Sequence, residues 1–353
     1  MNSIINVGLI GYGMAGQVFH APIISSIKGF NLYKVYERKQ ENVQKLKNKY
    51  GDVLSTSDLD DIFGDKNIQL VVIAAPNAVH FDLASKALKS GKNVVVEKPF
   101  TVTSEQAETL IKLAKDNGKI LTVNQNRRWD SDFRTVCKVI NNNLLGNIVE
   151  YEAHFDRYKN CLRESTWKEE QFPGSGVLYD LGSHLIDQAQ FLFGLPEKIF
   201  SNLNIQREGG KIVDNFETIL DYNNLKVTLK AGMLVRAKLP HFIVLGKSGS
   251  FIKYGMDTQE QLLKEGKIPK YVENWGVESR RNWGTINTEI RGCHFEGNIE
   301  SEIGDYRELY KNVYNAIMKN DGLEVTAEQA KNTIKIIELA IKSSKEKKWI
   351  NFN

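Results

Sequence analysis

Two short segments place an amine, a carboxylate and an imidazole at spacings that suit proton transfer. Lys98 follows the apolar run VVV in the segment EKP, where an amine in a half-buried cleft can polarise a carbonyl. Asp180 and His184 stand four positions apart, so a helix that has begun by Asp180 places carboxylate and imidazole on one face. An alcohol that gives up a hydride needs a base for its proton and a cation for the developing oxyanion. The two segments therefore favour hydride transfer at an alcohol carbon.

Each of these residues also has a structural interpretation that the sequence leaves open. A D-x-x-x-H pair is at least as often a capped helix start, and a lysine at a strand end is often a surface residue. Asp180, His184 and Asp187 are conceivable metal ligands, but no second histidine is clustered near them. We therefore expect no metal site.

A glycine-rich segment near the N-terminus has the spacing of a dinucleotide-binding turn. The run GYGMAG follows a predicted strand and opens a predicted helix, which is the context that gives the pattern its meaning. Gly11 permits the tight turn, Gly13 lets backbone amides approach a pyrophosphate, and Gly16 allows close packing of helix on strand. With Met14 and Ala15 between these glycines, free N–H groups at the helix start would hold the phosphates. The alternative is a glycine turn that binds nothing.

Two residues at the end of the second predicted strand favour different cofactors. Glu37 stands about twenty residues beyond the glycines, where a carboxylate accepts hydrogen bonds from the adenosine ribose and favours NAD. Arg38 argues for NADP, because a guanidinium pairs well with a 2′-phosphate. Solvated charges at a strand end are the alternative.

Alternating β-branched runs and amphipathic stretches predict the elements that position these groups. Five strand candidates precede residue 124, and helical patterns cover residues 78–89 and 103–116, the second opening on Ser104 as its N-cap. This rhythm predicts an α/β fold with a doubly wound parallel sheet, whose ligands bind at the carboxyl ends of the strands. The strand candidates are residues 7–10, 32–36, 70–74, 93–96 and 120–123.

After residue 124 the pattern changes to that of an α+β domain, which we expect to span residues 125–353. An apolar helix is predicted over 180–193, with Leu181, Leu185, Ala189 and Leu192 as its buried stripe. The runs 216–222, 226–230 and 242–245 predict an antiparallel meander, and a final helix is expected over 327–344. Residues 255–300 are polar, and whether they form a long excursion or a lid is undecided.

The composition bounds the class of protein. The chain has 353 residues, 41% of them hydrophobic and 25% charged, which suits two globular domains. The formal net charge of +4 is scattered apart from a lysine-rich end, so nucleic acid is not expected as a partner. Three separated cysteines, no signal-like start and no long apolar run favour a cytoplasmic protein without membrane segments.

Five segments taken together resemble the glucose-fructose oxidoreductase and inositol dehydrogenase (Gfo/Idh/MocA) family. They are, in order, GYGMAG, AAPNAVH, VVVEKPF, NRRWDSDF and YDLGSHLIDQ, and they extend over much of the chain. The scyllo-inositol dehydrogenase (NADP) branch is the most similar. The resemblance implies an N-terminal Rossmann domain and a C-terminal domain with a large open antiparallel sheet. It also implies an NAD(P)-dependent oxidoreductase acting on a secondary alcohol of a cyclitol or sugar; the alternative is a catalytically silent NAD(P)-binding sensor.

The resemblance also assigns roles to residues. It makes Lys98, Asp180 and His184 the catalytic group, with His184 as acid and base, and implies a cis bond before Pro99. Pro76, Asn77, Glu97 and Arg128 would line the ribose of the nicotinamide, and the position of His80 adds it to them. Position alone suggests Tyr158 and Trp167 as substrate contacts. Arg38 keeps half of the pattern of NADP-preferring relatives and Glu37 departs from it, so NADP is favoured with NAD open. A homodimer or homotetramer is expected.

Overall fold

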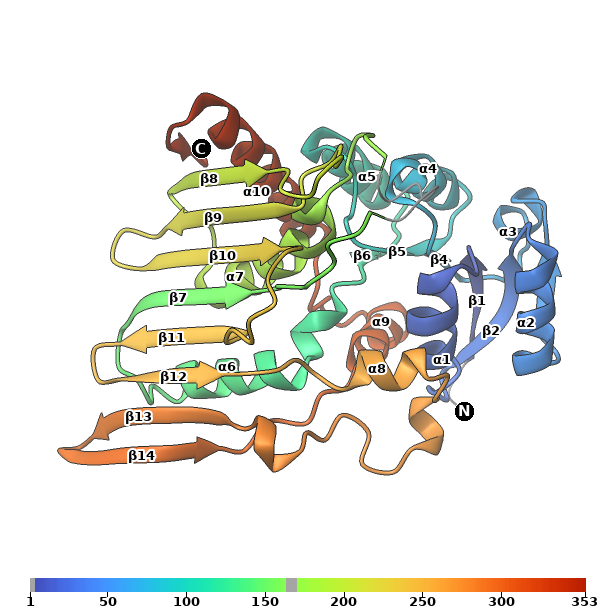
Figure 1. Ribbon diagram of the computed structural model, residues 1–353. Coiled ribbons are helices and arrows are strands. Elements are labelled where there is room, and N and C mark those ends of the chain that lie inside the picture. The colour runs from blue at the N-terminus through green and yellow to red at the C-terminus, as the bar shows by residue number, and fades with distance from the viewer. Residues whose placement is uncertain (1–3, 163–169) are drawn as a thin grey trace. The chain divides into compact units, whose positions relative to one another are not determined.

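The computed structural model describes residues 4–162 and 170–353, which form two compact units (Figure 1). Unit 1 comprises Met1–Asn126, Gln259–Trp275 and Asp305–Lys331, and unit 2 comprises Arg127–Thr258, Gly276–Gly304 and Asn332–Asn353. The division that the sequence suggested at residue 124 lies close to the point where the chain first leaves unit 1. Unit 1 also includes two later segments that the sequence assigned to the second domain.

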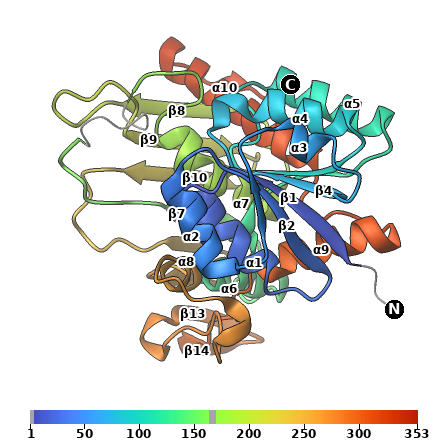
Figure 2. The same ribbon diagram turned by 90° about the vertical axis from the view of Figure 1, so that its right-hand side faces the viewer.

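The sheet of unit 1 is parallel throughout, as the βα alternation predicted. Its strand order is β3-β2-β1-β4-β5-β6, the doubly wound order of dinucleotide-binding domains. β4 and β5 are fully apolar apart from Asn93, because helices cover both faces of such a sheet (Figure 2). The strands are β1 (Ile5–Ile10), β2 (Phe30–Tyr36), β3 (Leu54–Thr56), β4 (Leu70–Ile73), β5 (Asn93–Val96) and β6 (Leu121–Val123).

The helices of unit 1 follow the predicted pattern, with one correction at an N-cap. Helix α5 begins at Ser104, but the capping residue is Thr103, whose hydroxyl accepts a hydrogen bond from the Gln106 N–H at 3.2 Å. The prediction of Ser104 as the cap was wrong by one residue, because the extended backbone that a cap requires lies at Thr103. The helices are η1 (Gly16–His20), α1 (Ala21–Ile24), α2 (Gln40–Tyr50), α3 (Asp60–Phe63), η2 (Asn77–Val79), α4 (His80–Lys89), α5 (Ser104–Asp116), α8 (Gln259–Lys264), η6 (Pro269–Tyr271) and α9 (Arg307–Lys319).

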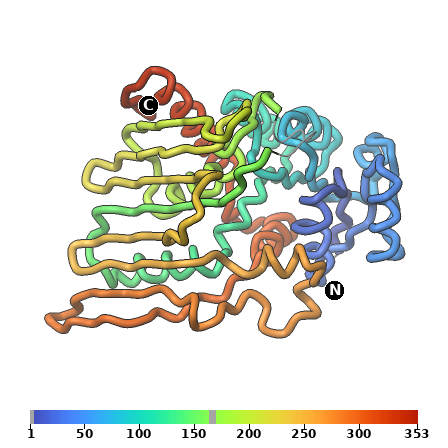
Figure 3. Tube along the Cα trace, in the orientation of Figure 1, coloured from blue at the N-terminus to red at the C-terminus, as the bar shows by residue number. Residues whose placement is uncertain are grey.

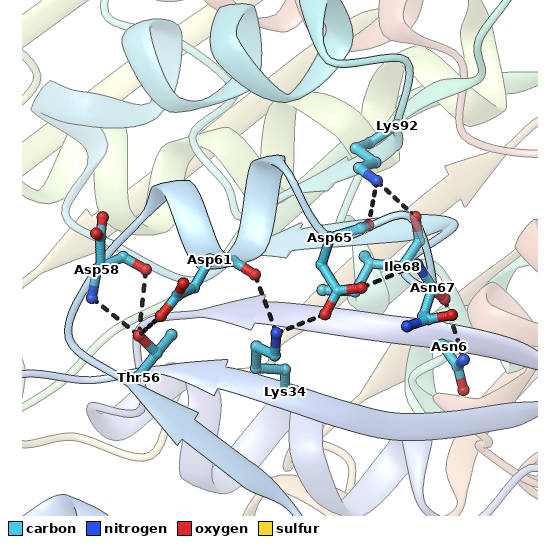
Figure 4. A network of polar contacts seen from close by, with 9 residues as sticks. All are labelled: Asn6, Lys34, Thr56, Asp58, Asp61, Asp65, Asn67, Ile68 and Lys92. Atoms are coloured by element: carbon cyan, nitrogen blue, oxygen red, sulfur yellow. Dashed lines mark hydrogen bonds and ion pairs between the residues drawn. The ribbon is translucent and has the colours of Figure 1, made fainter.

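Two lysines of unit 1 form hydrogen bonds with the loop that follows α3. Lys92 is only 6% exposed and donates to the backbone oxygens of Asp65 and Ile68, as Figure 4 shows. Lys34, on β2, reaches the Asp65 carboxylate and the Asp61 carbonyl from the other side. These bonds hold the loop that precedes β4, at the amino end of that strand.

Unit 2 contains a nine-stranded, mostly antiparallel sheet in the order β14-β13-β12-β11-β7-β10-β9-β8-β15. Helices α6 (Ser131–Asn141) and α7 (Ser183–Phe193) pack on one face, where Phe133 meets Phe242 and Phe193 meets Tyr151. The strands are β7 (Ile148–His154), β8 (Lys198–Asn204), β9 (Asn215–Asp221), β10 (Lys226–Gly232), β11 (Phe242–Gly246), β12 (Gly249–Lys253), β13 (Gly284–Ile290), β14 (Cys293–Ile299) and β15 (Ile350–Asn351). The expected α+β organisation is confirmed.

The predicted meander of three consecutive strands is wrong at its second step. β9 and β10 form an antiparallel pair, but β11 is separated from β10 by β7. Figure 3 shows this green strand running between two yellow-to-orange ones. β7 is parallel to β10 and antiparallel to β11. Tyr151 and Ala153 on β7 are fully buried, so this strand belongs inside the sheet, with a neighbour on each side.

The undecided region 255–300 forms ordered elements. It contributes α8 and η6 to unit 1, and the short helix η7 (Arg280–Asn282) and the hairpin β13–β14 to unit 2. The final helix, α10, spans Ala327–Glu346 and begins in unit 1 before continuing into unit 2. Within residues 4–162 and 170–353, no helix is long and apolar enough to cross a membrane.

Candidate active site

The glycine turn of unit 1 has the geometry that a bound pyrophosphate requires. Gly11 has a φ of +96°, and a Cβ there would lie 2.6 Å from the Ala74 carbonyl oxygen. A Cβ on Gly16 would lie 2.2 Å from the Gly11 carbonyl oxygen, so helix and turn could not pack with a side chain. Around Gly13, by contrast, nothing lies within 4 Å of such a Cβ. The residues therefore fit a dinucleotide, with open space where its phosphates approach the backbone.

Glu37 is engaged by the glycine turn itself. Its Oε2 accepts hydrogen bonds from the Tyr12 N–H at 3.1 Å and from Asn42 Nδ2 at 3.1 Å, and its Oε1 accepts from the Lys39 N–H at 2.8 Å. The side chain of Arg38 is exposed and forms no hydrogen bond or ion pair with the described residues. The carboxylate thus orders the loop, while the neighbouring guanidinium remains available to a ligand.

The loop after β4 carries the next group of predicted cofactor residues. Pro76 is exposed and Asn77 is half-buried. His80 is only 1% exposed, and its ring nitrogens lie 3.0 Å from the Pro99 carbonyl oxygen and 2.9 Å from the Ala75 carbonyl oxygen. Burial lowers the pKa of His80. In this arrangement His80 links the loops that follow β4 and β5.

Lys98 emerges where the sequence predicted, directly after β5 at the carboxyl edge of the parallel sheet. Its side chain is half-buried, and its backbone N–H donates to Glu97 Oε2 at 2.9 Å. The Lys98–Pro99 peptide bond is cis, as the resemblance implied. Glu97 itself is 7% exposed and lies among donors that the sequence did not reveal, namely His20, Asn124 and, through His20, Tyr310.

The second half of the predicted catalytic group belongs to unit 2. A π-helical turn over Leu178–Gly182 leads directly into α7, so the prediction that helix has begun by Asp180 is confirmed. Asp180 is exposed, whereas His184 is 4% exposed and its ring stacks on Phe155 with centroids 6.4 Å apart. The predicted buried stripe is confirmed at Leu181, Leu185 and Ala189, whereas Leu192, near the end of the helix, is only half-buried. Because Lys98 belongs to unit 1, the catalytic group of three residues stays a prediction.

Arginines surround the His184 side of unit 2. The guanidinium carbons of Arg127 and Arg157 lie 4.9 and 5.0 Å from the centroid of the Phe155 ring. Arg128, expected on the cofactor, is 5% exposed and holds Asp187 through two hydrogen bonds of 2.8 and 2.7 Å. Asp187 is therefore committed to an ion pair. Among the described residues, no group of His, Cys, Asp or Glu is arranged to hold a metal ion.

The predicted substrate contacts have different outcomes. Tyr158 is 45% exposed, forms a bridge with Leu234, and lies beneath Arg236 with the guanidinium carbon 4.1 Å from the ring centroid. Trp167 lies outside the described residues. Phe155 lies in the segment FDR, which resembles the family, but the sequence did not indicate that its ring stacks on a histidine distant in the chain.

Two family profiles together match nearly the whole chain. The profile described as "Oxidoreductase family, NAD-binding Rossmann fold" matches residues 5–125. The profile described as "Oxidoreductase family, C-terminal alpha/beta domain" matches residues 138–352. Both belong to the Gfo/Idh/MocA oxidoreductases.

Individual relatives agree with the profiles. The scyllo-inositol 2-dehydrogenase (NADP(+)) IolW of Bacillus subtilis is 38% identical over 98% of this chain and 95% of its own length. A solved oxidoreductase structure from Bacillus subtilis is 37% identical, with a TM-score of 0.95 over 99% of both chains. Another, from Bacteroides fragilis, is 44% identical, with a TM-score of 0.89 over 99% of this chain and 100% of that one. The chain therefore belongs to the Gfo/Idh/MocA family of NAD(P)-dependent oxidoreductases.

Proposed function

We propose that this oxidoreductase transfers a hydride between a nicotinamide cofactor and a secondary alcohol or ketone carbon of a cyclitol or sugar. The observation that carries the proposal is the position of Lys98. It follows β5 at the edge of the sheet where the glycine turn also lies, since Gly11 packs on Ala74 at the end of the neighbouring β4. Ligands of doubly wound sheets bind at this edge. A cation there is well placed to act on a substrate oxygen.

Three side chains divide the work in this proposal. When bound, the nicotinamide accepts or supplies the hydride. His184, buried against Phe155, takes the hydroxyl proton or returns it. Asp180 accepts a hydrogen bond from the reacting hydroxyl and orients it, and Lys98 holds the substrate oxygen as negative charge develops on it. Tyr158, exposed beneath Arg236, is a candidate contact for the remaining hydroxyls.

For the substrate class we propose inositols first and aldoses second. The activity named for the Bacillus subtilis relative, whose similarity extends over 98% of this chain, supports a scyllo-inositol-like polyol. A spectrophotometric screen of NAD and NADP against inositols, aldoses and their ketones tests this. Reduction of a cofactor by one polyol supports the proposal. Cofactor binding without turnover across the panel would favour the alternative, a silent NAD(P)-binding sensor of the same fold.

We favour NADP as the cofactor. Glu37 is occupied by three hydrogen bonds from within its own unit, one of them from Tyr12 in the glycine turn, and the adjacent guanidinium of Arg38 is exposed, as a partner for a 2′-phosphate must be. The name of the NADP-dependent relative points the same way. NAD use is the competing outcome, and the ratio of the two dissociation constants decides between them.

The roles of the catalytic group are tested by substitution. Lys98→Ala and His184→Ala are each expected to lower turnover at least about a hundredfold while NADPH still binds. Lys115→Ala on α5 and His294→Ala on β14 are matched controls, because both side chains are exposed. Turnover at the wild-type rate in both test variants would overturn the assignment.

We also propose that the protein is a homo-oligomer and that it is located in the cytoplasm. Among the described residues, helices α6 and α7 cover one face of the unit 2 sheet, and the opposite face favours a homodimer or homotetramer, which light scattering during size-exclusion chromatography measures. A cytoplasmic location is supported by the cysteines Cys137, Cys161 and Cys293, all of which are free thiols.

A further inference from the structure

Glu97 is a buried carboxylate that accepts hydrogen bonds from three directions within unit 1. Its Oε1 lies 2.8 Å from His20 Nε2 and 2.7 Å from Asn124 Nδ2, and its Oε2 accepts the Lys98 N–H at 2.9 Å. A carboxylate offers about four acceptor positions, so the protein fills most of them. Groups within unit 1 therefore hold the Glu97 side chain, and one of them is the backbone N–H of Lys98.

The donor on His20 is fixed in turn by a tyrosine from the last third of the chain. The Tyr310 hydroxyl lies 2.6 Å from His20 Nδ1; His20 is 0% exposed and Tyr310 is 1% exposed. Helix α9, which carries Tyr310, belongs to the same compact unit as β5. A buried chain of hydrogen bonds thus runs from Tyr310 through His20 and Glu97 to the backbone of Lys98.

The ionisation states of Glu97 and Tyr310 bear on which groups donate the hydrogen bonds. Burial alone would raise the pKa of Glu97, but the hydrogen bond from His20, with the charge of Lys98, lowers it below its ordinary value. Burial raises the pKa of Tyr310 well above 10. Glu97 is therefore ionised and Tyr310 is a phenol at neutral pH. Because an ionised carboxylate only accepts hydrogen bonds, Nε2 carries the hydrogen that His20 donates to Glu97.

We infer that His20 and Tyr310 are positioning residues that hold Lys98 in place through the Glu97 carboxylate. The inference rests on the function proposed for Lys98. His20 ends η1, the helix that follows the glycine turn, so one element links the dinucleotide loop to the strand end bearing Lys98. Glu97 then has a different main role from the ribose contact that the family resemblance implied.

A packing role for the two rings is the competing explanation. The Tyr310 ring meets His20 and Phe30 edge to face, with centroids 6.2 and 5.9 Å apart. Tyr310→Phe keeps both ring contacts and removes only the hydroxyl. At position 20, glutamine reaches about as far as Nε2 and can still donate to Glu97, whereas asparagine reaches only as far as Nδ1. These variants separate hydrogen bonding from packing.

The first test needs no catalysis. The Lys98 amide is the one exchangeable backbone hydrogen between Glu97 and Pro99, and its exchange is measured in the cofactor-free protein by mass spectrometry. We expect His20→Asn to speed this exchange by at least about tenfold. Tyr310→Phe and His20→Gln each lose the bond between residues 20 and 310 but keep a donor to Glu97, so both should speed the exchange by a smaller factor. Tyr314→Phe is the matched control, because Tyr314 lies one turn along α9 and also packs on Phe30.

Kinetics provide the second test. We expect kcat to fall about tenfold to a hundredfold in His20→Asn, with His20→Gln restoring most of it and the dissociation constant of the cofactor unchanged in both. Wild-type exchange in His20→Asn or in Tyr310→Phe would overturn the inference, as would equal acceleration by His20→Gln and His20→Asn. If wild-type protein turns over no polyol, the proposed function fails. The exchange experiment still decides whether the hydrogen bonds from Tyr310 through His20 and Glu97 hold Lys98.

Discussion

Asp132, at the start of α6 in unit 2, is a fully buried carboxyl group with few donors. Its Oδ1 accepts from the Phe133 N–H at 2.8 Å, and its Oδ2, which lies 3.7 Å from His241 Nε2, has no hydrogen-bond partner among residues 4–162 and 170–353. Burial raises its pKa to about 7; the charge of Lys253 opposes this rise, and Asp257 and Glu278 add to it. Asp132 therefore gains and loses its proton near neutral pH.

The sign and size of the effect on stability follow from this pKa. Because the folded value lies above the ordinary 3.8, the folded protein holds the proton more tightly than the unfolded chain does. The stabilisation is complete below about pH 4 and is lost as the pH rises through about 7. The gap between the two values corresponds to roughly 4 kcal/mol, at about 1.4 kcal/mol for each pH unit. Asp132→Asn is neutral and has the same shape, so it does not suffer this loss.

The assay is urea denaturation of wild type and Asp132→Asn from about pH 5 to about pH 8, followed by a probe in unit 2. We expect the variant to gain stability relative to wild type across this range, by up to roughly 4 kcal/mol at the upper end. Asp116→Asn, at an exposed position on α5, removes the same charge and should show no such trend. A difference between Asp132→Asn and wild type that stays constant with pH would refute the reasoning.

Three further predictions concern the cofactor and the core. Arg38→Ala should weaken NADPH binding about tenfold or more and leave NADH binding unchanged, as measured by nicotinamide fluorescence; equal losses would remove Arg38 from the phosphate site. Gly13→Ala should keep the wild-type melting temperature, because the added Cβ meets no protein atom within 4 Å, but it should weaken cofactor binding by filling the space of the phosphates. Gly16→Ala should lower the melting temperature, because its Cβ would lie 2.2 Å from the Gly11 carbonyl oxygen. Asp187→Ala should lower the free energy of unfolding by about 3–5 kcal/mol, because it leaves the buried Arg128 charge without its carboxylate, and Asp187→Asn should lose less.

The parts of the fold that depend on local pattern could be predicted from the sequence. The parallel sheet of unit 1 was predictable because a strand buried on both faces is apolar throughout, as β4 and β5 are. The glycine turn and the position of Lys98 followed from the same order of elements. Helix α7 was found from its apolar spacing, and its π-helical start did not disturb the prediction.

The parts that depend on pairing between distant segments could not be predicted. The insertion of β7 between β10 and β11 is decided by which strands bury Tyr151 and Ala153, and no local signal records it. Helix α9 lies far along the chain from β5, yet its Tyr310 belongs to the hydrogen-bond chain that ends at Lys98. Sequence motifs pointed to residues at the edge of the sheet, whereas the bond between His20 and Tyr310 joins segments that are 290 positions apart.

Two buried carboxylates in this chain differ in how far hydrogen-bond donors and neighbouring charges offset the effect of burial on the pKa. Both Glu97 and Asp132 are buried deeply enough for desolvation to raise the pKa. Glu97 accepts hydrogen bonds from His20, Asn124 and the Lys98 N–H, and its pKa falls below the ordinary value. Asp132 accepts one backbone hydrogen bond and has acidic neighbours, and its pKa rises to about 7. Unit 1 thus commits a histidine, an asparagine and a tyrosine to keeping one charge beside Lys98, which is the arrangement expected where that charge serves the proposed reaction.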